Sequence, residues 1–325
     1  MSPRLRATRP AAILLMAVTL LGCGGKSADF QVRPFPVESH GRWIGNAVCY
    51  GPHRDGQRPG GDDPSAAELR EDLGLMIPHW NLLRIYGSTG YSETLLKVIR
   101  EDGFDMKVML GVWIAPDAAE ANRREIDDAI RLAAAFPGIV TAVCVGNETQ
   151  IEWSAHRSSL DTLITHVRRV RTNVVVPVTV ADDYNFWNKA ESRKLSAEID
   201  FITMHAHPLW NGLQLDGALP WLKDQLAYVR DLHPGRPVLV GETGWATTVH
   251  DEGEQAKLIK GRAGEAEQKV FFHEVRAWAA AEKLPVFFFE AFDENWKGGP
   301  HPAEVEKHWG LFHTDRTPKL ALSPG

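Results

Sequence analysis

Two glutamates follow two apolar runs of the 325-residue chain, and together they could break a glycosidic bond. Glu148 ends the run Ile139-Val-Thr-Ala-Val-Cys-Val-Gly-Asn-Glu148, and Glu242 follows Pro237-Val-Leu-Val-Gly. Short runs rich in Val and Ile are typical of buried parallel strands. Two carboxyl groups at the carboxyl ends of such strands can act as a proton donor and a nucleophile in glycoside hydrolysis.

Apolar runs and helical patterns alternate along the chain. Strands that alternate with helices pair in parallel through right-handed crossovers. Eight such units predict a single α/β domain folded as a (β/α)8 barrel (TIM barrel), with its active site at the carboxyl ends of the strands. The predicted strands are 43–50, 81–86, 106–113, 139–147, 174–180, 199–205, 238–241 and 286–291. The clearest predicted helices are 65–75 (with Ser65 as N-cap), 92–101, 117–136 and 265–282.

Composition and charge argue against some classes of binding partner. The net charge of -6 argues against a nucleic-acid partner, because binding phosphates needs a basic face. No Gly-rich phosphate loop follows the first strand, which disfavours a dinucleotide-binding sheet. Cys49 and Cys144 fall in strands that are not neighbours, so we expect two free thiols. We expect no cofactor and no metal, and a monomer.

The N-terminus resembles the signal peptide of a bacterial lipoprotein. Three arginines between residues 4 and 9 precede an apolar stretch over residues 11–21, which is too short for a membrane span. Leu20-Leu-Gly-Cys23 resembles a lipobox, which implies a signal peptide over residues 1–22 and lipidation of Cys23. Gly24 after the cysteine favours the outer membrane; an ordinary signal for a periplasmic or secreted protein is the alternative. We predict a linker over residues 23–41 and a catalytic domain over residues 42–325.

Polar and aromatic residues occupy the predicted strand ends. Such a rim suits a polyhydroxylated, ring-shaped substrate, since amides and carboxylates bond hydroxyl groups and flat rings stack on sugars. We expect Trp210 and Trp245 to be sugar platforms, and we assign Trp113 and Trp153 to packing. Tyr50 and Arg84 also lie at strand ends, and Arg84 could lower the pKa of the nucleophile by its opposite charge.

Several ordered motifs resemble those of glycoside hydrolase family 17, which contains retaining β-1,3-glucanases and related β-1,3-glucanosyltransferases. The resemblance covers almost the whole mature chain. Together with the N-terminal segment, it implies a bacterial lipoprotein form of the family. It rests first on Val145-Gly-Asn-Glu148, Gly241-Glu-Thr-Gly-Trp245 and Phe289-Glu-Ala-Phe-Asp-Glu-Asn-Trp-Lys297. Cys49-Tyr-Gly51, Arg84-Ile-Tyr86 and Glu306-Lys-His-Trp-Gly310 follow the same order.

The resemblance implies a role for each catalytic glutamate. Glu148 matches the general acid/base and Glu242 the nucleophile. Asn147 matches the residue that contacts the sugar 2-hydroxyl at the cleavage site, and Tyr86 matches an aromatic residue that lines the subsite of the attacked sugar. The implied substrate is a β-glucan polysaccharide or oligosaccharide.

The resemblance also implies a polar pair near the acid/base, Glu294 and Lys297. The chain departs from the plant members at His205-Ala-His207, where they carry a Tyr-rich segment. We expect His205 to hold an oxygen of the nucleophile.

Other interpretations remain open at the level of sequence. The two glutamates could form structural ion pairs, or the chain could be a non-catalytic carbohydrate-binding lipoprotein on a hydrolase barrel. The two histidines of His205-Ala-His207 could belong to a metal-dependent hydrolase, although the other strand ends lack the His and Asp ligands that such a site needs. Hydrolysis and transglycosylation use the same glutamates, and the choice between endo and exo action depends on loops.

Overall fold

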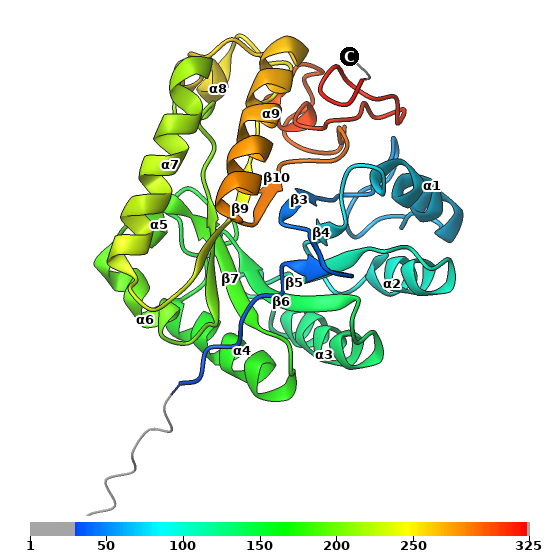
Figure 1. Cartoon of the computed structure of the whole chain (residues 1–325), viewed down its shortest axis with the longest axis vertical. Coiled ribbons are helices and arrows are strands. Elements are labelled where there is room, and N and C mark those ends of the chain that lie inside the picture. The colour runs from blue at the N-terminus through cyan, green and yellow to red at the C-terminus, as the bar shows by residue number, and fades with distance from the viewer. Residues whose placement is uncertain (1–29, 324–325) are drawn as a thin grey trace, which may run out of the picture. The chain divides into compact units, whose positions relative to one another are not determined.

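Eight parallel strands close into a barrel, as the alternation of strands and helices predicts (Figure 1). The computed structural model describes residues 30–323. The order around the barrel is β10-β3-β4-β5-β6-β7-β8-β9, so the first and last barrel strands pair with each other. The strands are β3 Asn46–Cys49, β4 Leu82–Arg84, β5 Lys107–Val112, β6 Val140–Asn147, β7 Val178–Asp183, β8 Phe201–His205, β9 Val238–Thr243 and β10 Val286–Phe288.

Helices surround the barrel and cover its outer face (Figure 1). The longer ones are α1 Ala66–Met76, α2 Ser92–Glu101, α3 Ala119–Ala135, α4 Leu160–Asn173, α7 Leu215–Leu232 and α9 Glu265–Glu282. Short elements lie in the connections: α5 Tyr184–Trp187, η1 Ala190–Ser192, α6 Arg193–Ser196, α8 Gly253–Leu258 and η2 Val305–Lys307. No helix between residues 30 and 323 is long and apolar enough to cross a bilayer.

Ser65 caps α1 as the sequence predicts. Its hydroxyl accepts a hydrogen bond from the Glu68 backbone N–H at 3.3 Å, and the Glu68 carboxylate accepts one from the Ser65 N–H at 2.7 Å. This reciprocal pair is a capping box, which satisfies two amide groups that the helix itself cannot bond. The predicted bounds of α2 and α9 also agree with the structure.

The observed strands differ from the predicted ones by one to four residues at one or both ends, and β7 and β10 are examples. β7 begins at Val178 rather than at residue 174, because Pro177 has no N–H to donate and Val175 is exposed to solvent. The carboxylate of Asp200 accepts the Val178 N–H at 2.8 Å and fixes the start of the strand. β10 ends at Phe288, three residues before its predicted end.

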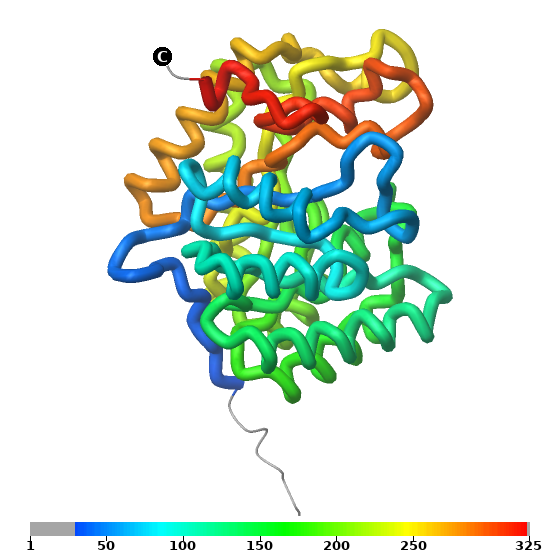
Figure 2. The backbone as a smooth tube through the Cα atoms, turned by 90° about the vertical axis from the view of Figure 1, so that its right-hand side faces the viewer, coloured from blue at the N-terminus to red at the C-terminus, as the bar shows by residue number. Residues whose placement is uncertain are grey.

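The second half of the predicted linker packs against the domain. Arg33 forms an ion pair with Asp200 at 2.8 Å, and the ring of Phe35 lies 5.0 Å from that of Phe201. β1 (Glu38–Ser39) and β2 (Arg42–Trp43) form a small antiparallel pair. Figure 2 shows this dark blue segment at one end of the barrel and the loop after β3 at the other. The predicted signal peptide of residues 1–22 and the lipidated Cys23 lie outside the described residues.

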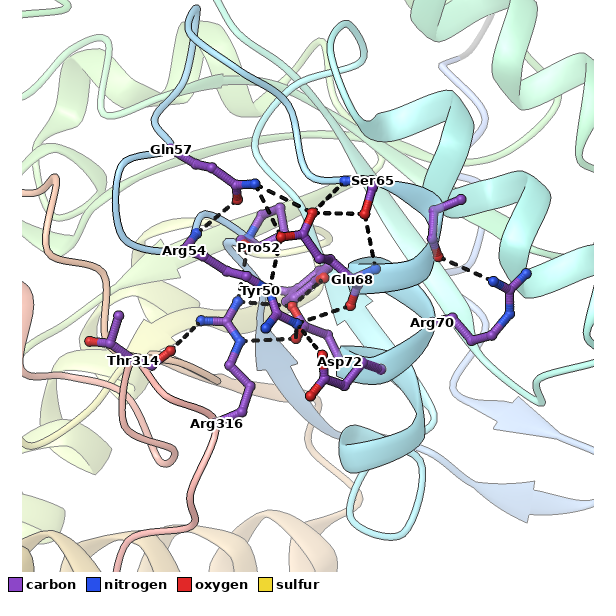
Figure 3. A network of polar contacts seen from close by, with 12 residues as sticks. Tyr50, Pro52, Arg54, Gln57, Ser65, Glu68, Arg70, Asp72, Thr314 and Arg316 are labelled. Carbon is purple, nitrogen blue, oxygen red and sulfur yellow. Dashed lines mark hydrogen bonds and ion pairs between the residues drawn. The ribbon is translucent and has the colours of Figure 1, made fainter.

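A buried ionic network joins α1 to the C-terminal tail (Figure 3). The carboxylate of Asp72 accepts hydrogen bonds from Arg316 Nε and Nη2, each at 3.0 Å. The Tyr50 hydroxyl and Arg54 Nη2 also donate to it, both at 3.0 Å. One buried carboxylate on α1 therefore binds both the loop after β3 and the tail.

Candidate active site

A cavity of about 1390 Å³ opens at the carboxyl ends of the barrel strands. Pockets for small ligands are typically about 300–1,000 Å³, so this one has room for more than one sugar ring. Its lining residues come from loops that follow strands all around the barrel, and both predicted catalytic glutamates are among them. The position agrees with the general rule for this barrel fold.

Glu148 at the end of β6 and Glu242 in β9 face each other across the barrel mouth. One carboxylate oxygen of each and one nitrogen of His205 all lie within 4.8 Å of one another. Retaining glycosidases place their two carboxyl groups about 5–5.5 Å apart, whereas inverting enzymes separate them by about 6.5–9.5 Å to admit a water molecule. The spacing is that of a retaining enzyme.

Glu242 is held by three donors. Arg84 Nη1 lies 2.5 Å and the Tyr86 hydroxyl 3.0 Å from its Oε1, and His207 Nε2 lies 3.3 Å from its Oε2. Burial alone would raise the pKa of this carboxyl, but His205, Arg84 and His207 outweigh that effect and hold the pKa well below its usual range. Glu242 is therefore ionised at neutral pH, as a nucleophile must be.

The backbone at Glu148 is unusual. Its φ of 50° lies in the left-handed region, which non-glycine residues rarely adopt. The β6–β7 register shifts between Cys144 and Asn147, and the Glu148 N–H donates to the Ala181 carbonyl at 2.9 Å. A register shift of this kind changes the direction in which a side chain points next to an active site. Here the Glu148 carboxyl, about a quarter exposed, turns into the cavity.

His205 contacts both glutamates, but its hydrogen bond is with Glu148 rather than with Glu242 as expected. Its Nδ1 lies 3.0 Å from Glu148 Oε1, and its Nε2 lies 3.4 Å from Glu242 Oε1. The shorter contact is thus to the acid/base, and His207 is the histidine that forms a hydrogen bond with Glu242. Burial lowers the pKa of His207, but Glu242 outweighs this effect and the pKa is raised. The sequence motif contained both histidines, but the side chain of His207 could not be placed from it.

Arg84 connects Glu242 to Asn147, the neighbour of Glu148. Arg84 is buried, does not line the cavity, and donates from Nη2 to Asn147 Oδ1 at 2.6 Å. Asn147 itself lines the cavity beside Glu148. Arg84 therefore orients Glu242 and Asn147 rather than the substrate.

Lys297 lies between two buried carboxyl groups. Its Nζ is 2.6 Å from Glu290 and 2.9 Å from Glu294. Burial would raise the pKa of Glu294, but Lys297, with hydrogen bonds from His53 and Trp296, lowers it to about 2. Burial raises the pKa of Glu290 well above its usual range. Sequence reasoning placed Glu294 and Lys297 together but missed Glu290, which lies in the same motif.

Tyr50 and Trp245, which we expected to contact sugar, lie away from the cavity, and the buried side chains of Arg84 and His205, predicted as substrate-binding residues, do not line it either. The Tyr50 side chain is fully buried and its hydroxyl donates to Asp72 at 3.0 Å. The Trp245 indole packs on Phe271 with ring centroids 5.6 Å apart and donates to the Arg262 carbonyl at 2.9 Å. Neither lines the cavity. Tyr50 belongs to the network of Figure 3, and Trp245 belongs to the core.

The tryptophans of the cavity are partly different from those expected. Trp210 lines it as predicted, and its indole N–H donates to Glu306 at 3.0 Å. Trp113 and Trp153, which we assigned to packing, also line it. Trp153 is 64% exposed, so it cannot be a packing residue.

Three residues of the site have the side-chain types of a metal centre. Within residues 30–323, one group of three or more His, Cys, Asp or Glu side chains could hold a metal ion. It consists of Glu148, His205 and Glu242. In this structure the two ring nitrogens of His205 face different carboxylates, at 3.0 Å from Glu148 and 3.4 Å from Glu242. The arrangement also suits paired carboxyl groups in acid/base and nucleophilic roles.

Fold and site together define a glycoside hydrolase of the (β/α)8 class. Residues 47–310 match the BtgE/BtgC glycoside hydrolase domain, and the chain belongs to this family. A glucan 1,3-beta-glucosidase of Arthroderma benhamiae is 30% identical over 284 residues, which are 81% of this chain and 87% of that protein. A glucan 1,3-beta-glucosidase of Schizosaccharomyces pombe is 27% identical and covers 96% of both chains.

Solved structures agree with this assignment. An endo-laminarinase from Formosa has 26% sequence identity and a TM-score of 0.76, with 86% of each chain covered. A glycoside hydrolase family 17 β-1,3-glucanosyltransferase from Rhizomucor miehei has 23% identity and a TM-score of 0.71, covering 85% of this chain and 96% of that one. The second comparison supports the fold alone.

Proposed function

We propose that the protein cleaves β-1,3-glucosidic bonds of β-glucan with retention of configuration, through a covalent glycosyl-enzyme intermediate. The observation that carries this proposal is the spacing of Glu148 and Glu242, whose oxygens approach within 4.8 Å. The linkage follows from the relatives, which are named as glucan 1,3-beta-glucosidases and an endo-laminarinase.

The reaction has two steps. In the first, Glu242 attacks the anomeric carbon while Glu148 gives its proton to the glycosidic oxygen, so the leaving sugar departs and a glycosyl ester forms on Glu242. Arg84 and Tyr86 hold the Glu242 carboxylate in place for this attack. In the second step, Glu148 takes a proton from the acceptor, whose oxygen bonds to the anomeric carbon and releases Glu242.

The decisive experiment is product analysis with β-1,3-gluco-oligosaccharides. We expect the protein to release shorter products whose first-formed anomer is β, measured by chromatography and proton NMR. The Glu242→Gln variant should lose about a thousandfold or more of this activity, because a neutral amide cannot form the ester. Glu274→Gln, on the exposed face of α9, is the matched control and should keep it.

The outcomes separate the alternatives. Near wild-type activity of Glu242→Gln would contradict the nucleophile assignment. Products longer than the substrate would identify a β-1,3-glucanosyltransferase that uses the same glutamates. Binding of the oligosaccharides without turnover would identify a carbohydrate-binding protein, and turnover of β-1,4-glucan alone would contradict the linkage.

We also propose that the mature protein is a monomer tethered to the cell envelope by lipid on Cys23. Support comes from the sequence Leu20-Leu-Gly-Cys23 and the basic and apolar segments before it. Cys23→Ser should abolish incorporation of labelled palmitate and release the protein from the membrane fraction. Labelling of Cys23→Ser at the wild-type level would contradict the proposal. Light scattering of the detergent-solubilised protein should give the mass of one chain.

A further inference from the structure

An exposed indole forms part of the cavity wall close to the acid/base. Trp153 lies in the loop after β6, five residues beyond Glu148, and lines the cavity. It is 64% exposed, the most exposed tryptophan in the described part of the chain. Within that part its ring makes no aromatic contact and no hydrogen bond. A large flat side chain exposed in this way contributes nothing to the core, and its place in the cavity wall leaves a ring face free for a ligand.

The loop that carries the indole is fixed at its base. The Ser158 N–H donates to the Thr149 carbonyl at 3.1 Å, and Gln150 Nε2 donates to the Ser158 carbonyl at 3.2 Å. The buried carboxylate of Asp182 accepts the N–H groups of Gln150 at 2.8 Å and Ile151 at 3.2 Å. The base of the loop that carries Trp153 is therefore held in a defined place relative to Glu148.

The position of Glu148 tells which part of a substrate reaches this loop. A general acid donates its proton to the oxygen of the leaving group, so it lies on the side of the departing sugar. β5, β6 and β7 are neighbours in the barrel, and the loops after them form the wall on the Glu148 side. Besides Glu148, that wall contains Trp113, Trp153, His156, Asn185 and Lys189.

We propose that Trp153 is a binding platform for a neutral pyranose ring of the leaving group, and afterwards for the sugar that competes with water as acceptor. This inference rests on the proposed function and extends it to the choice between hydrolysis and transfer. In the transfer step a hydroxyl of the acceptor sugar gives its proton to Glu148. The oxygen of that acceptor hydroxyl then bonds to the anomeric carbon as the ester bond to Glu242 breaks. A sugar stacked on the indole is held near the ester at a high effective concentration.

The test compares two substrates that differ in their leaving group. β-1,3-Gluco-oligosaccharides can place a sugar on Trp153, whereas the fluoride leaving group of laminaribiosyl fluoride has no ring that could stack there. We expect Trp153→Ala to lower kcat/KM on the oligosaccharides about tenfold, the size of effect that one aromatic contact can give. The share of products longer than the substrate should fall with it. Release of fluoride from laminaribiosyl fluoride in the absence of added sugar should not change.

Two further variants control for the substitution. Trp153→Tyr keeps a flat ring and should restore most of the lost activity. Tyr228→Ala removes an aromatic residue that is 57% exposed on α7 and lies outside the cavity, so it should match the wild type on both substrates.

An equal fall in kcat/KM of Trp153→Ala on both substrates, or no fall on either, would contradict the role of Trp153 as a binding platform. Failure of the wild type to turn over either β-1,3-linked substrate would instead overturn the proposed function, and the platform with it.

Discussion

At the scale of single residues, Arg84 is one of the groups that lower the pKa of Glu242, together with His205 and His207. Its guanidinium donates to Glu242 and to Asn147, and it lies 4.6 Å above the ring of Tyr86. Because Arg84 is buried, its charge acts on Glu242 with little screening by solvent. The lowered pKa of Glu242 keeps this carboxylate ionised even in mildly acidic solution.

Replacing Arg84 should therefore change the pH dependence of the reaction. Arg84→Gln removes the positive charge, so the pKa of Glu242 rises. As the pH is lowered, the variant should therefore lose activity at a higher pH than the wild type does. We expect the acid limb of kcat/KM to move up by about one pH unit or more. The measurement is the pH profile of the variant beside that of Arg123→Gln, an exposed arginine of α3. An unmoved acid limb would show that other groups keep Glu242 ionised.

Residues at strand ends could be predicted from the sequence only where the strand's last residue was clear. Glu148 and Glu242 end long apolar runs, so their place at the barrel mouth followed directly. Tyr50 comes immediately after β3, where side chains alternate between the two faces, and it points outward to α1. Trp245 lies two residues past β9, and its burial depends on Phe271 of a distant helix, which no local pattern reveals.

At the scale of elements, the tail is bound to α1 through the Asp72 network of Figure 3. The Arg316 side chain is buried, and two of its nitrogens donate to Asp72 while Nη2 also donates to the Pro52 carbonyl. The tail forms no helix or strand over residues 309–323, so contacts such as these and the ion pair between Lys319 and Asp293 fix its position.

Breaking that network should destabilise the whole domain. Arg316→Met leaves the buried carboxylate of Asp72 with a weaker set of partners, and removing one partner of a buried ion pair typically costs about 3–5 kcal/mol. Denaturant unfolding measures this change in the free energy of unfolding. Arg123→Met, which breaks a solvent-exposed ion pair of α3, should cost about 1 kcal/mol or less. Equal costs for the two variants would argue against a structural role for the tail.

Element boundaries were predictable where a local signal marks them. The Ser65 cap and the pattern of 265–282 gave α1 and α9 closely, because capping and helical periodicity are read within one element. The start of β7 depended instead on Pro177 and on the distant Asp200. The packing of residues 31–41 depended likewise on tertiary partners such as Phe201.

At the scale of the whole molecule, the barrel followed from the order of strands and helices, whereas the shape of the cavity did not. The fold needs only eight repeated units, and each unit carries its own pattern. The cavity wall is formed by loops of irregular sequence, which explains why Trp153 was assigned to packing although it is exposed. The local sequence shows that a tryptophan is present, but not whether its side chain will pack in the core or line the cavity.

The pairing of β3 with β10 also governs how the chain must fold. β3 is the first barrel strand to be synthesised and β10 the last, so the ring cannot close until nearly all of the domain has been made. Until then one edge of β3 and one edge of β9 have no partner, and unpaired strand edges promote association between chains. Contacts so far apart in sequence also form slowly. The growing chain is therefore most exposed to aggregation just before its final strand inserts.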